Sequence, residues 1–268
     1  MPELPDVELF KRYLDSHALH QTIRRVTVSD TRILRGVSAK ELVARLEGNR
    51  IEASERHGKH LLARLARDGW LTLHFGMTGG LVYFRDAASA PPQERLRFDF
   101  GKGRHLAYTS RRMLGRVGLT DDAAGFIKSE GLGPDALDPA FDVATFQATL
   151  GRRQRDVKSA LMEQSLIAGI GNIYADEILF QAGVHPSTRV VQLSEEKRRQ
   201  IFGRIKEVLN TAIECGTDAE LALDRLPSGY LLRHRTRGGH CPRCGRTITS
   251  FKSSGRTTYY CSHCQRLT

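Results

Sequence analysis

The sequence predicts an α+β protein of several domains, with a β-rich N-terminal part, a helical central part and a small metal-binding hairpin at the C-terminus. Short segments with alternating apolar and polar residues occur up to about residue 120, and segments of helix-forming composition follow from about residue 130. Four of the five cysteines lie in two Cys-x-x-Cys pairs near the C-terminus. The 268 residues are enough for one large domain or two smaller ones, and the 40% hydrophobic content is typical of a globular protein.

The N-terminal part is expected to begin with one helix and to continue as strands. Pro5 opens the helix, and apolar residues follow it at helical spacing. Residues 70–75 (WLTLHF) alternate after the turn signal Asp68-Gly69, and residues 95–100 (RLRFDF) alternate before a turn at GKG. Several short strands separated by glycine turns predict a sandwich or a barrel.

Three segments of the central part predict helices, namely residues 158–167, 173–182 and 195–214. The sequence AGIGN lies between the first two, at residues 168–172. Two glycines and an asparagine allow a tight turn whose backbone amides point outward at a helix N-terminus, and such a turn is suited to binding phosphate. An ordinary turn between two helices is the simpler interpretation when this turn is taken alone.

The C-terminal cysteines predict a zinc site. Cys241 and Cys244 are separated from Cys261 and Cys264 by sixteen residues that read as a β-hairpin. Two such pairs can place four thiolates around one tetrahedral zinc ion, and a hairpin of this size needs the metal because it cannot bury a core. Two disulfides are the alternative. Cys215 is left over and is expected to be an inert helix thiol.

The positive charge is concentrated near the C-terminus. The net charge is +11, and the last sixth of the chain contains nine Lys or Arg residues but no Asp or Glu. A concentrated positive charge points to a polyanionic partner, most often nucleic acid, and a solvated basic tail is the alternative. The nine residues are Arg225, Arg233, Arg235, Arg237, Arg243, Arg246, Lys252, Arg256 and Arg266.

The sequence shows no membrane or export signal. No apolar run approaches the ~18 residues that a membrane helix needs, and the first residues, MPELPDVELFKRY, mix acidic and basic side chains. We therefore expect no membrane association and a location in the cytoplasm, in contact with the nucleoid.

Three motifs occur in an order that resembles the formamidopyrimidine-DNA glycosylase/endonuclease VIII family: MPELPDVE, GIGNIYADEILF and CPRC…CSHC. The first two are more similar to the formamidopyrimidine branch. The resemblance implies an N-terminal catalytic β-sandwich at residues 1–120, a helix-two-turn-helix DNA-binding domain at 130–232 and a β-hairpin zinc finger at 235–268.

The same resemblance implies a bifunctional DNA glycosylase/AP lyase of base excision repair. The expected enzyme removes formamidopyrimidines and 8-oxoguanine from damaged double-stranded DNA and nicks the strand by β,δ-elimination. It would act as a monomer with one structural Zn²⁺ and no nucleotide cofactor.

In the family, the proline after the initiator methionine is the nucleophile, and here this residue is Pro2. Once Met1 is removed, its secondary amine should have a pKa of about 8, so a useful fraction is unprotonated at neutral pH. While Met1 is attached, the nitrogen is an amide and cannot attack. Glu3 matches the family's general acid. A carboxylate that stabilises a helix N-terminus is the alternative role for Glu3.

Other matching positions are expected to bind DNA. Lys59 matches a catalytic strand lysine that contacts phosphates and can donate a proton, although a surface lysine on a strand edge is the alternative. Asn172 and Arg256 match residues that hold phosphates on the kinked strand, and Arg256 is counted with Pro2, Glu3 and Lys59 as a catalytic residue. Arg95 and Arg153 fall near DNA-contact positions of the family.

Three further residues are expected to fill the space left by an extruded nucleotide. Met77 matches the family's methionine, and an ungapped alignment places Arg112 on the arginine that reads the orphaned base. The same alignment puts Leu114 where the family usually has phenylalanine, and leucine stacks less well. A gapped alignment would select Arg111 instead of Arg112, so the preference for the opposite base stays open.

The segment between Gly216 and Cys241 looks several residues shorter than the family's lid over 8-oxoguanine. We hypothesise that the shorter lid weakens recognition of 8-oxoguanine and favours formamidopyrimidines or oxidised pyrimidines. A zinc-ribbon protein that binds DNA or DNA damage without catalysis is the alternative function.

Overall fold

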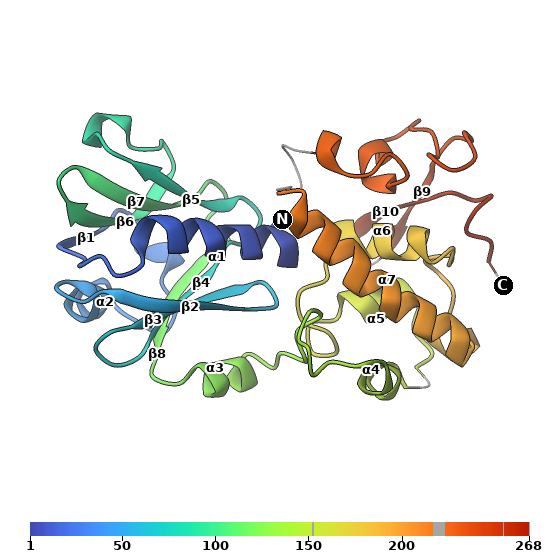
Figure 1. Cartoon of the computed structure of the whole chain (residues 1–268), viewed down its shortest axis with the longest axis horizontal. Coiled ribbons are helices and arrows are strands. Elements are labelled where there is room, and N and C mark those ends of the chain that lie inside the picture. Colours follow the sequence, from blue (N-terminus) through green and yellow to red (C-terminus); the bar gives the residue numbers. More distant parts are fainter. Residues whose placement is uncertain (152, 217–222, 254, 268) are drawn as a thin grey trace. The chain divides into compact units, whose positions relative to one another are not determined.

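The structure, a computed structural model, describes residues 1–151, 153–216, 223–253 and 255–267. The chain forms two compact units (Figure 1). The first unit contains Met1–Pro2 and Asp6–Glu130, and the second contains Glu3–Pro5 and Gly131–Thr268. The three residues that follow Pro2 therefore pack with the second unit, although the rest of the first helix packs with the first.

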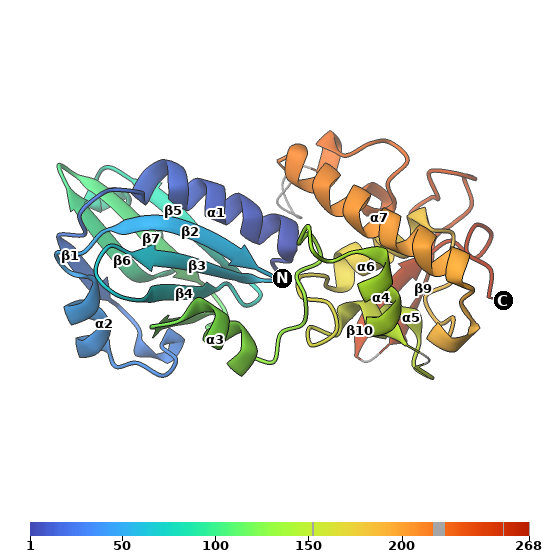
Figure 2. The same ribbon diagram turned by 60° about the horizontal axis from the view of Figure 1, so that its bottom comes forward.

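The first unit is a sandwich of two four-stranded antiparallel sheets (Figure 2). One sheet has the strand order β1-β6-β7-β5 and the other has the order β2-β3-β4-β8. Leu73 of the second sheet and Phe98 of the first belong to one buried core, so the sandwich prediction is confirmed. The strands are β1 (Arg25–Val28), β2 (Ile51–His57), β3 (His60–Leu65), β4 (Trp70–His74), β5 (Gly79–Phe84), β6 (Glu94–Gly101), β7 (Arg104–Ser110) and β8 (Arg116–Thr120).

The two predicted strands of this unit differ in burial. In β6, buried and half-buried residues alternate as predicted. In β4, however, the three central residues from Leu71 to Leu73 are all buried. On the outer face of this sheet Thr72 and His60 line a recess that Phe126 of α3 (Ala123–Ser129) borders, with its ring 5.5 Å from that of His60. Alternation in the sequence therefore predicted the strand correctly, but it did not predict which residues of the strand are buried.

Two helices accompany the sandwich in addition to α3. Helix α1 (Leu4–Ala18) begins within one residue of Pro5, as predicted, and the ring of Phe10 lies 4.4 Å from that of Phe75. Helix α2 (Ala39–Leu46) was not predicted, although the side chain of Ser38 accepts a hydrogen bond from the Glu41 amide at its N-terminus. The Ser-x-x-Glu pattern is a known start signal for a helix.

The second unit contains four helices and the C-terminal hairpin among its described residues. They are α4 (Val143–Leu150), α5 (Val157–Met162), α6 (Asn172–Gln181), α7 (Glu195–Glu214), β9 (Thr249–Ser253) and β10 (Arg256–Tyr260). The predictions of α6, α7 and the hairpin are confirmed. Leu4 is fully buried in the core of this unit, together with Tyr174 and Ile178.

The predicted helix over residues 158–167 is wrong beyond Met162. The side-chain amide of Gln164 donates to the carbonyl oxygens of Met162 and Ile170, both at 2.8 Å. The Gln164 side chain thus donates to the Met162 carbonyl in place of a helical backbone amide, and it also bonds the turn that follows. Helix-forming composition could not reveal this competition.

No helix in the described part of the chain has the length and hydrophobicity required to cross a bilayer.

Candidate functional site

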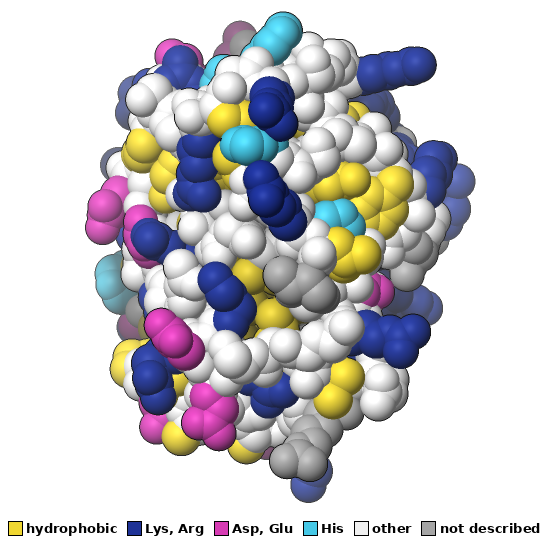
Figure 3. All heavy atoms as spheres, turned by 90° about the vertical axis from the view of Figure 1, so that its right-hand side faces the viewer, with side chains coloured by type: hydrophobic (Ala, Val, Ile, Leu, Met, Phe, Trp, Pro, Cys, Tyr) yellow, Lys and Arg dark blue, Asp and Glu magenta, His cyan; other side chains and the backbone are white. Residues whose placement is uncertain are grey.

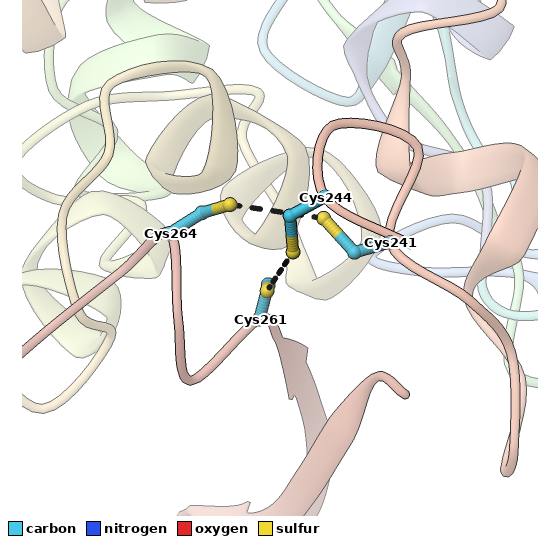
Figure 4. A group of neighbouring side chains, drawn as sticks. All are labelled: Cys241, Cys244, Cys261 and Cys264. Atoms are coloured by element: carbon cyan, nitrogen blue, oxygen red, sulfur yellow. Dashed lines mark hydrogen bonds between the residues drawn. The ribbon is translucent and has the colours of Figure 1, made fainter. Parts of the chain in front are cut away.

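The four C-terminal cysteines form a site whose dimensions fit zinc (Figure 4). Their sulfur atoms all lie within 4.8 Å of one another. The Sγ atoms of Cys241 and Cys264 are 3.8 Å apart, and those of Cys244 and Cys261 are 3.6 Å apart. A tetrahedral Zn–S₄ site with Zn–S bonds of about 2.3 Å has S···S edges of about 3.8 Å. A disulfide needs about 2.05 Å, so the disulfide alternative is wrong.

Backbone and side-chain contacts hold the two cysteine pairs. The Cys241 amide donates to the Arg246 carbonyl at 2.7 Å, and the Arg246 amide lowers the pKa of the Cys244 thiol to about 7 by donating a hydrogen bond to it. Gln265 is fully buried and links the second pair to the rest of the unit. Its side chain accepts from the Cys261 amide at 3.0 Å and donates to the Val184 carbonyl at 2.8 Å.

Glu3 binds the N-terminus of α6. Its Oε2 accepts hydrogen bonds from the amides of Gly171 at 2.8 Å and Tyr174 at 3.2 Å, and its Oε1 accepts from the Ile173 amide at 2.8 Å. Only 1% of Glu3 is exposed. The first amides of a helix have no partner within the helix and carry its positive dipole end, so a carboxylate is a suitable ligand.

This arrangement corrects one prediction. The amides of residues 168–172 were expected to point outward and to suit a phosphate. Instead, the amides of Gly171, Ile173 and Tyr174 donate hydrogen bonds to Glu3. Glu3 does stabilise a helix N-terminus, but that helix is α6, which is distant in the sequence, and not the helix that follows Glu3 directly.

A buried ion pair lies beside Asn172. The Nζ atom of Lys158 is 2.6 Å from Oδ1 of Asp176, and both side chains are at least 98% buried. The same ammonium donates to Oδ1 of Asn172 at 2.8 Å and to Oγ1 of Thr258 at 2.7 Å. Burial lowers the pKa of Lys158 and raises the pKa of Asp176, and the attraction between the two charges opposes both shifts.

The same network holds β10 of the zinc-finger hairpin. Oδ2 of Asp176 accepts from Nε of Arg235 at 2.9 Å and from the Tyr259 amide at 3.1 Å. The side-chain amide of Asn172 donates to the Thr257 carbonyl at 3.2 Å. Three consecutive residues of β10, from Thr257 to Tyr259, are therefore bonded to the network.

Arg256 directly precedes these three residues at the start of β10. Its side chain is exposed, and no described residue forms a hydrogen bond or ion pair with its guanidinium group. The arginine is thus attached to a fixed backbone while its charge faces solvent.

Met77, Arg112 and Leu114 lie on two adjoining loops of the first unit. The Arg112 amide donates to Oγ1 of Thr78 at 3.1 Å, and a Cβ atom on Gly76 would lie 2.4 Å from the Leu114 backbone. Met77 is 39% exposed and Leu114 is 48% exposed, so both belong to the few large apolar side chains that the described chain exposes.

Lys59 lies in the two-residue turn between β2 and β3 and is only 7% exposed. The alternative of a surface lysine on a strand edge is therefore wrong. Arg95 donates to the Ser110 carbonyl at 2.9 Å. Arg153 donates to the last carbonyls of α4, those of Thr149 and Leu150, at 2.7 and 2.8 Å.

Sequence reasoning missed the buried charged residues of the second unit. Lys158 and Asp176 were not singled out, and neither was Glu177, a fully buried side chain whose pKa is raised to about 7 by burial. Glu177 accepts from the Leu232 amide at 2.8 Å. The signal that could have revealed Asp176 and Glu177 is two adjacent acidic residues inside an otherwise apolar helix.

Basic side chains are spread over the end of the second unit that faces the viewer in Figure 3, and acidic side chains lie mainly toward one edge of that view. The surface is consistent with a polyanionic partner. Part of the predicted lid between Gly216 and Cys241, residues 217–222, lies outside the described residues.

Comparisons with known proteins cover nearly the whole chain. A model of the formamidopyrimidine-DNA glycosylase N-terminal domain matches residues 1–117, and a model of the H2TH domain of the same glycosylase matches residues 132–221. A model of a zinc finger found in FPG and IleRS matches residues 238–267.

Curated relatives agree with these matches. Formamidopyrimidine-DNA glycosylase of Carboxydothermus hydrogenoformans is 35% identical over 99% of this chain and 100% of its own length. The enzyme of Moorella thermoacetica is 36% identical over 92% of this chain and 93% of its own length.

Solved structures are similar over the full length as well. A structure of the Lactococcus lactis glycosylase bound to DNA with an AP site has a TM-score of 0.88 and 29% identity, and covers 98% of this chain and 99% of that chain. A complex of the same organism's protein with DNA containing N7-benzyl-Fapy-dG has a TM-score of 0.89 and 29% identity, and covers 99% of this chain and 100% of that chain.

The zinc site predicts the effect of removing one ligand. Cys244→Ser should lose the metal, and DNA affinity should fall with it, because the small apolar cluster of the hairpin is built around the zinc ligands Cys241 and Cys261 and depends on the metal. Elemental analysis and DNA titration measure the two effects. Cys215→Ser, which changes the cysteine outside the cluster, should keep one zinc per chain. Unchanged DNA affinity in a zinc-free Cys244→Ser protein would contradict this prediction.

The buried ion pair predicts a loss of stability. Lys158→Met leaves Asp176 without its closest cation and should lower the free energy of unfolding by about 3 kcal/mol. Urea unfolding measures the change. Lys40→Met, on the exposed surface of α2, is the matched control and should change stability by less than about 0.5 kcal/mol. Equal stability of the Lys158→Met and Lys40→Met proteins would rule out a stabilising ion pair.

Proposed function

The chain belongs to the formamidopyrimidine-DNA glycosylase family, and from this premise we propose that it is a bifunctional DNA glycosylase/AP lyase that removes oxidised bases from double-stranded DNA in base excision repair. The observation that carries the proposal is the N-terminal pair Pro2-Glu3, in which Glu3 is fixed by three backbone amides of α6. A zinc ribbon without catalysis does not account for the match over residues 1–117.

Pro2 supplies the nucleophile once Met1 has been removed. Its secondary amine attacks C1′ of the damaged nucleotide, so an N–C1′ bond forms while the bond from C1′ to the base breaks. The amine loses its proton, and the departing base takes one up. Opening of the sugar ring gives an iminium ion that acidifies the C2′ proton. Loss of this proton breaks the C3′–O bond by β-elimination, and δ-elimination then breaks the C5′–O bond.

Glu3 is the proposed general acid toward the sugar ring oxygen. Its place directly after Pro2 supports the role, and three amides fix the position of the side chain. A proton that Glu3 transfers is therefore delivered from a defined place, and proton transfer depends on such placement.

Phosphates of the damaged strand are the proposed ligands of Lys59, Asn172 and Arg256. Asn172 uses one N–H of its side chain for the Thr257 carbonyl and keeps a second N–H. The guanidinium of Arg256 is exposed and has no partner among the described residues. An arginine can bind a phosphate through two hydrogen bonds.

Two further arginines are proposed DNA contacts. Arg95 and Arg153 each use one guanidinium nitrogen for carbonyl oxygens of the protein and have other donors left for a phosphate.

Met77, Arg112 and Leu114 are the proposed residues that fill the space of the extruded nucleotide. Exposed apolar side chains on a loop are unfavourable in water, and insertion between bases would bury them. Arg111 is also exposed and is the alternative to Arg112 as the residue that reads the orphaned base. We propose that the enzyme acts as a monomer in the cytoplasm, on DNA of the nucleoid.

Trapping with borohydride tests the function. The protein, incubated with a duplex containing an AP site, should form a covalent adduct when the imine is reduced, and Pro2→Gly should lose most of it. Pro92→Gly, in an exposed loop, is the control and should give as much adduct as the unchanged protein. Intact-mass spectrometry should show that Met1 is absent from the reactive molecules. Full activity of a preparation in which every molecule keeps Met1 would exclude attack by Pro2.

Lesion preference tests the hypothesis of a shortened lid. Duplexes with FapyG·C, 8-oxoG·C, thymine glycol and dihydrouracil are cleaved in parallel, and single-turnover rates are compared. We expect FapyG·C or an oxidised pyrimidine to be cleaved faster than 8-oxoG·C, since a shorter lid makes fewer contacts with an extruded 8-oxoguanine. The hypothesis fails if 8-oxoG·C is the fastest substrate.

A further inference from the structure

We propose that Gly171 is a positioning residue for the N-terminal nucleophile. The glycine leaves the space in which the carboxylate of Glu3 binds the first turn of α6, and Glu3 in turn fixes its neighbour Pro2. This inference rests on the proposed function of Pro2 and adds a residue that does not itself touch DNA or the reacting atoms.

Space, and not backbone conformation, requires glycine at this position. Gly171 has φ −128° and ψ −161°, an extended conformation that any residue adopts. A Cβ atom here would lie 2.3 Å from both Cδ and Oε1 of Glu3 and 2.8 Å from its Cγ. Ordinary contacts between carbon atoms are about 3.5 Å or longer, so the carboxylate would have to move by about 1 Å.

Such a movement would affect all three hydrogen bonds of the carboxylate. Gly171, Ile173 and Tyr174 donate to it over 2.8 to 3.2 Å, and Glu3 is almost completely buried. A displaced carboxylate leaves these amides without their partner in a place that water does not reach freely. Alanine at position 171 would therefore shift the position in which α6 holds Glu3.

A second glycine of the same turn holds the next residue. Gly169 has φ +111°, and a Cβ on it would lie 2.5 Å from Cδ1 of Leu4. The Leu4 amide donates to the Gly169 carbonyl at 3.1 Å, and the Leu4 side chain is fully buried. Two consecutive residues after Pro2 are thus held by one turn.

The position of Glu3 limits the position of the Pro2 nitrogen. The peptide bond between them is planar, so only rotations about the Cα–C bond of Pro2 and the N–Cα bond of Glu3 separate the amine from the Cα atom of Glu3. Displacement of Glu3 is therefore transmitted to the amine. A misplacement of about 1 Å can reduce the rate of a reaction about 100-fold, even when the change lies away from the reacting atoms.

The turn also explains why the effect should be confined to the chemical step. Asn172 lies between the two donors Gly171 and Ile173, but its side chain points to Lys158 and Thr257, not to Glu3. The three atoms nearest to a Cβ on Gly171 all belong to Glu3, and none of the three belongs to the zinc finger. DNA contacts made through Asn172 and Arg256 should persist.

Kinetics of Gly171→Ala test the inference. The single-turnover rate of base release and of adduct formation should fall about 100-fold, whereas the Kd for a duplex with an AP-site analogue and the zinc content should stay the same. Gly203→Ala in α7 is the matched control, because a Cβ there meets nothing within 4 Å. A rate of Gly171→Ala equal to that of Gly203→Ala overturns the inference, and so does a loss of DNA affinity as large as the loss of rate.

A double-mutant cycle separates positioning through Glu3 from a general structural effect. Glu3→Ala removes the side chain that the new Cβ would meet, so the double variant should be no slower than Glu3→Ala alone. A further loss of rate in the double variant would overturn the inference. If Gly171→Ala alone does not fold, the comparison of the double variant with Glu3→Ala still tests the inference. Failure of the unchanged protein to form any adduct would instead refute the proposed function.

Discussion

The binding of the Glu3 carboxylate to the N-terminus of α6 is the interaction on which the candidate site depends. A helix N-terminus offers free amides and a positive dipole end, and such a place commonly binds an anionic ligand. Here the carboxylate accepts hydrogen bonds from the amides of Gly171, Ile173 and Tyr174, and the Leu4 amide donates to the Gly169 carbonyl. The place that could have bound a phosphate instead fixes the start of the chain, where the proposed nucleophile lies.

The same helix organises the zinc finger through its other face. Asp176, one turn after Asn172, is fully buried and balances Lys158 and Arg235. Lys158 and Arg235 both pair with Asp176, and the charge of Glu3 also acts on Lys158. Desolvation of these groups is costly, and ionic hydrogen bonds to Asn172 and Thr258 offset part of that cost. The zinc cluster and this network therefore fix the hairpin at two separate places.

Secondary structure was predictable where a pattern was long and local. Helix α7 matches its predicted bounds because twenty residues of helix-forming composition follow a capping serine, Ser194. The end of α5 was not predictable, since the side chain of Gln164 competes for a backbone carbonyl. Helix α2 was missed despite its Ser-x-x-Glu start signal at Ser38, because only eight residues follow it.

By itself the sequence determined the ligands of the zinc site and the order of the three structural parts, because these depend on residue type and spacing along the chain, whereas Pro2 and Glu3 became candidates through the resemblance to a known family. Only the tertiary structure decided which groups Glu3 binds and that Lys158 pairs with Asp176. These partners lie far apart in the sequence, and their charges become decisive only when burial removes the water that would otherwise solvate them.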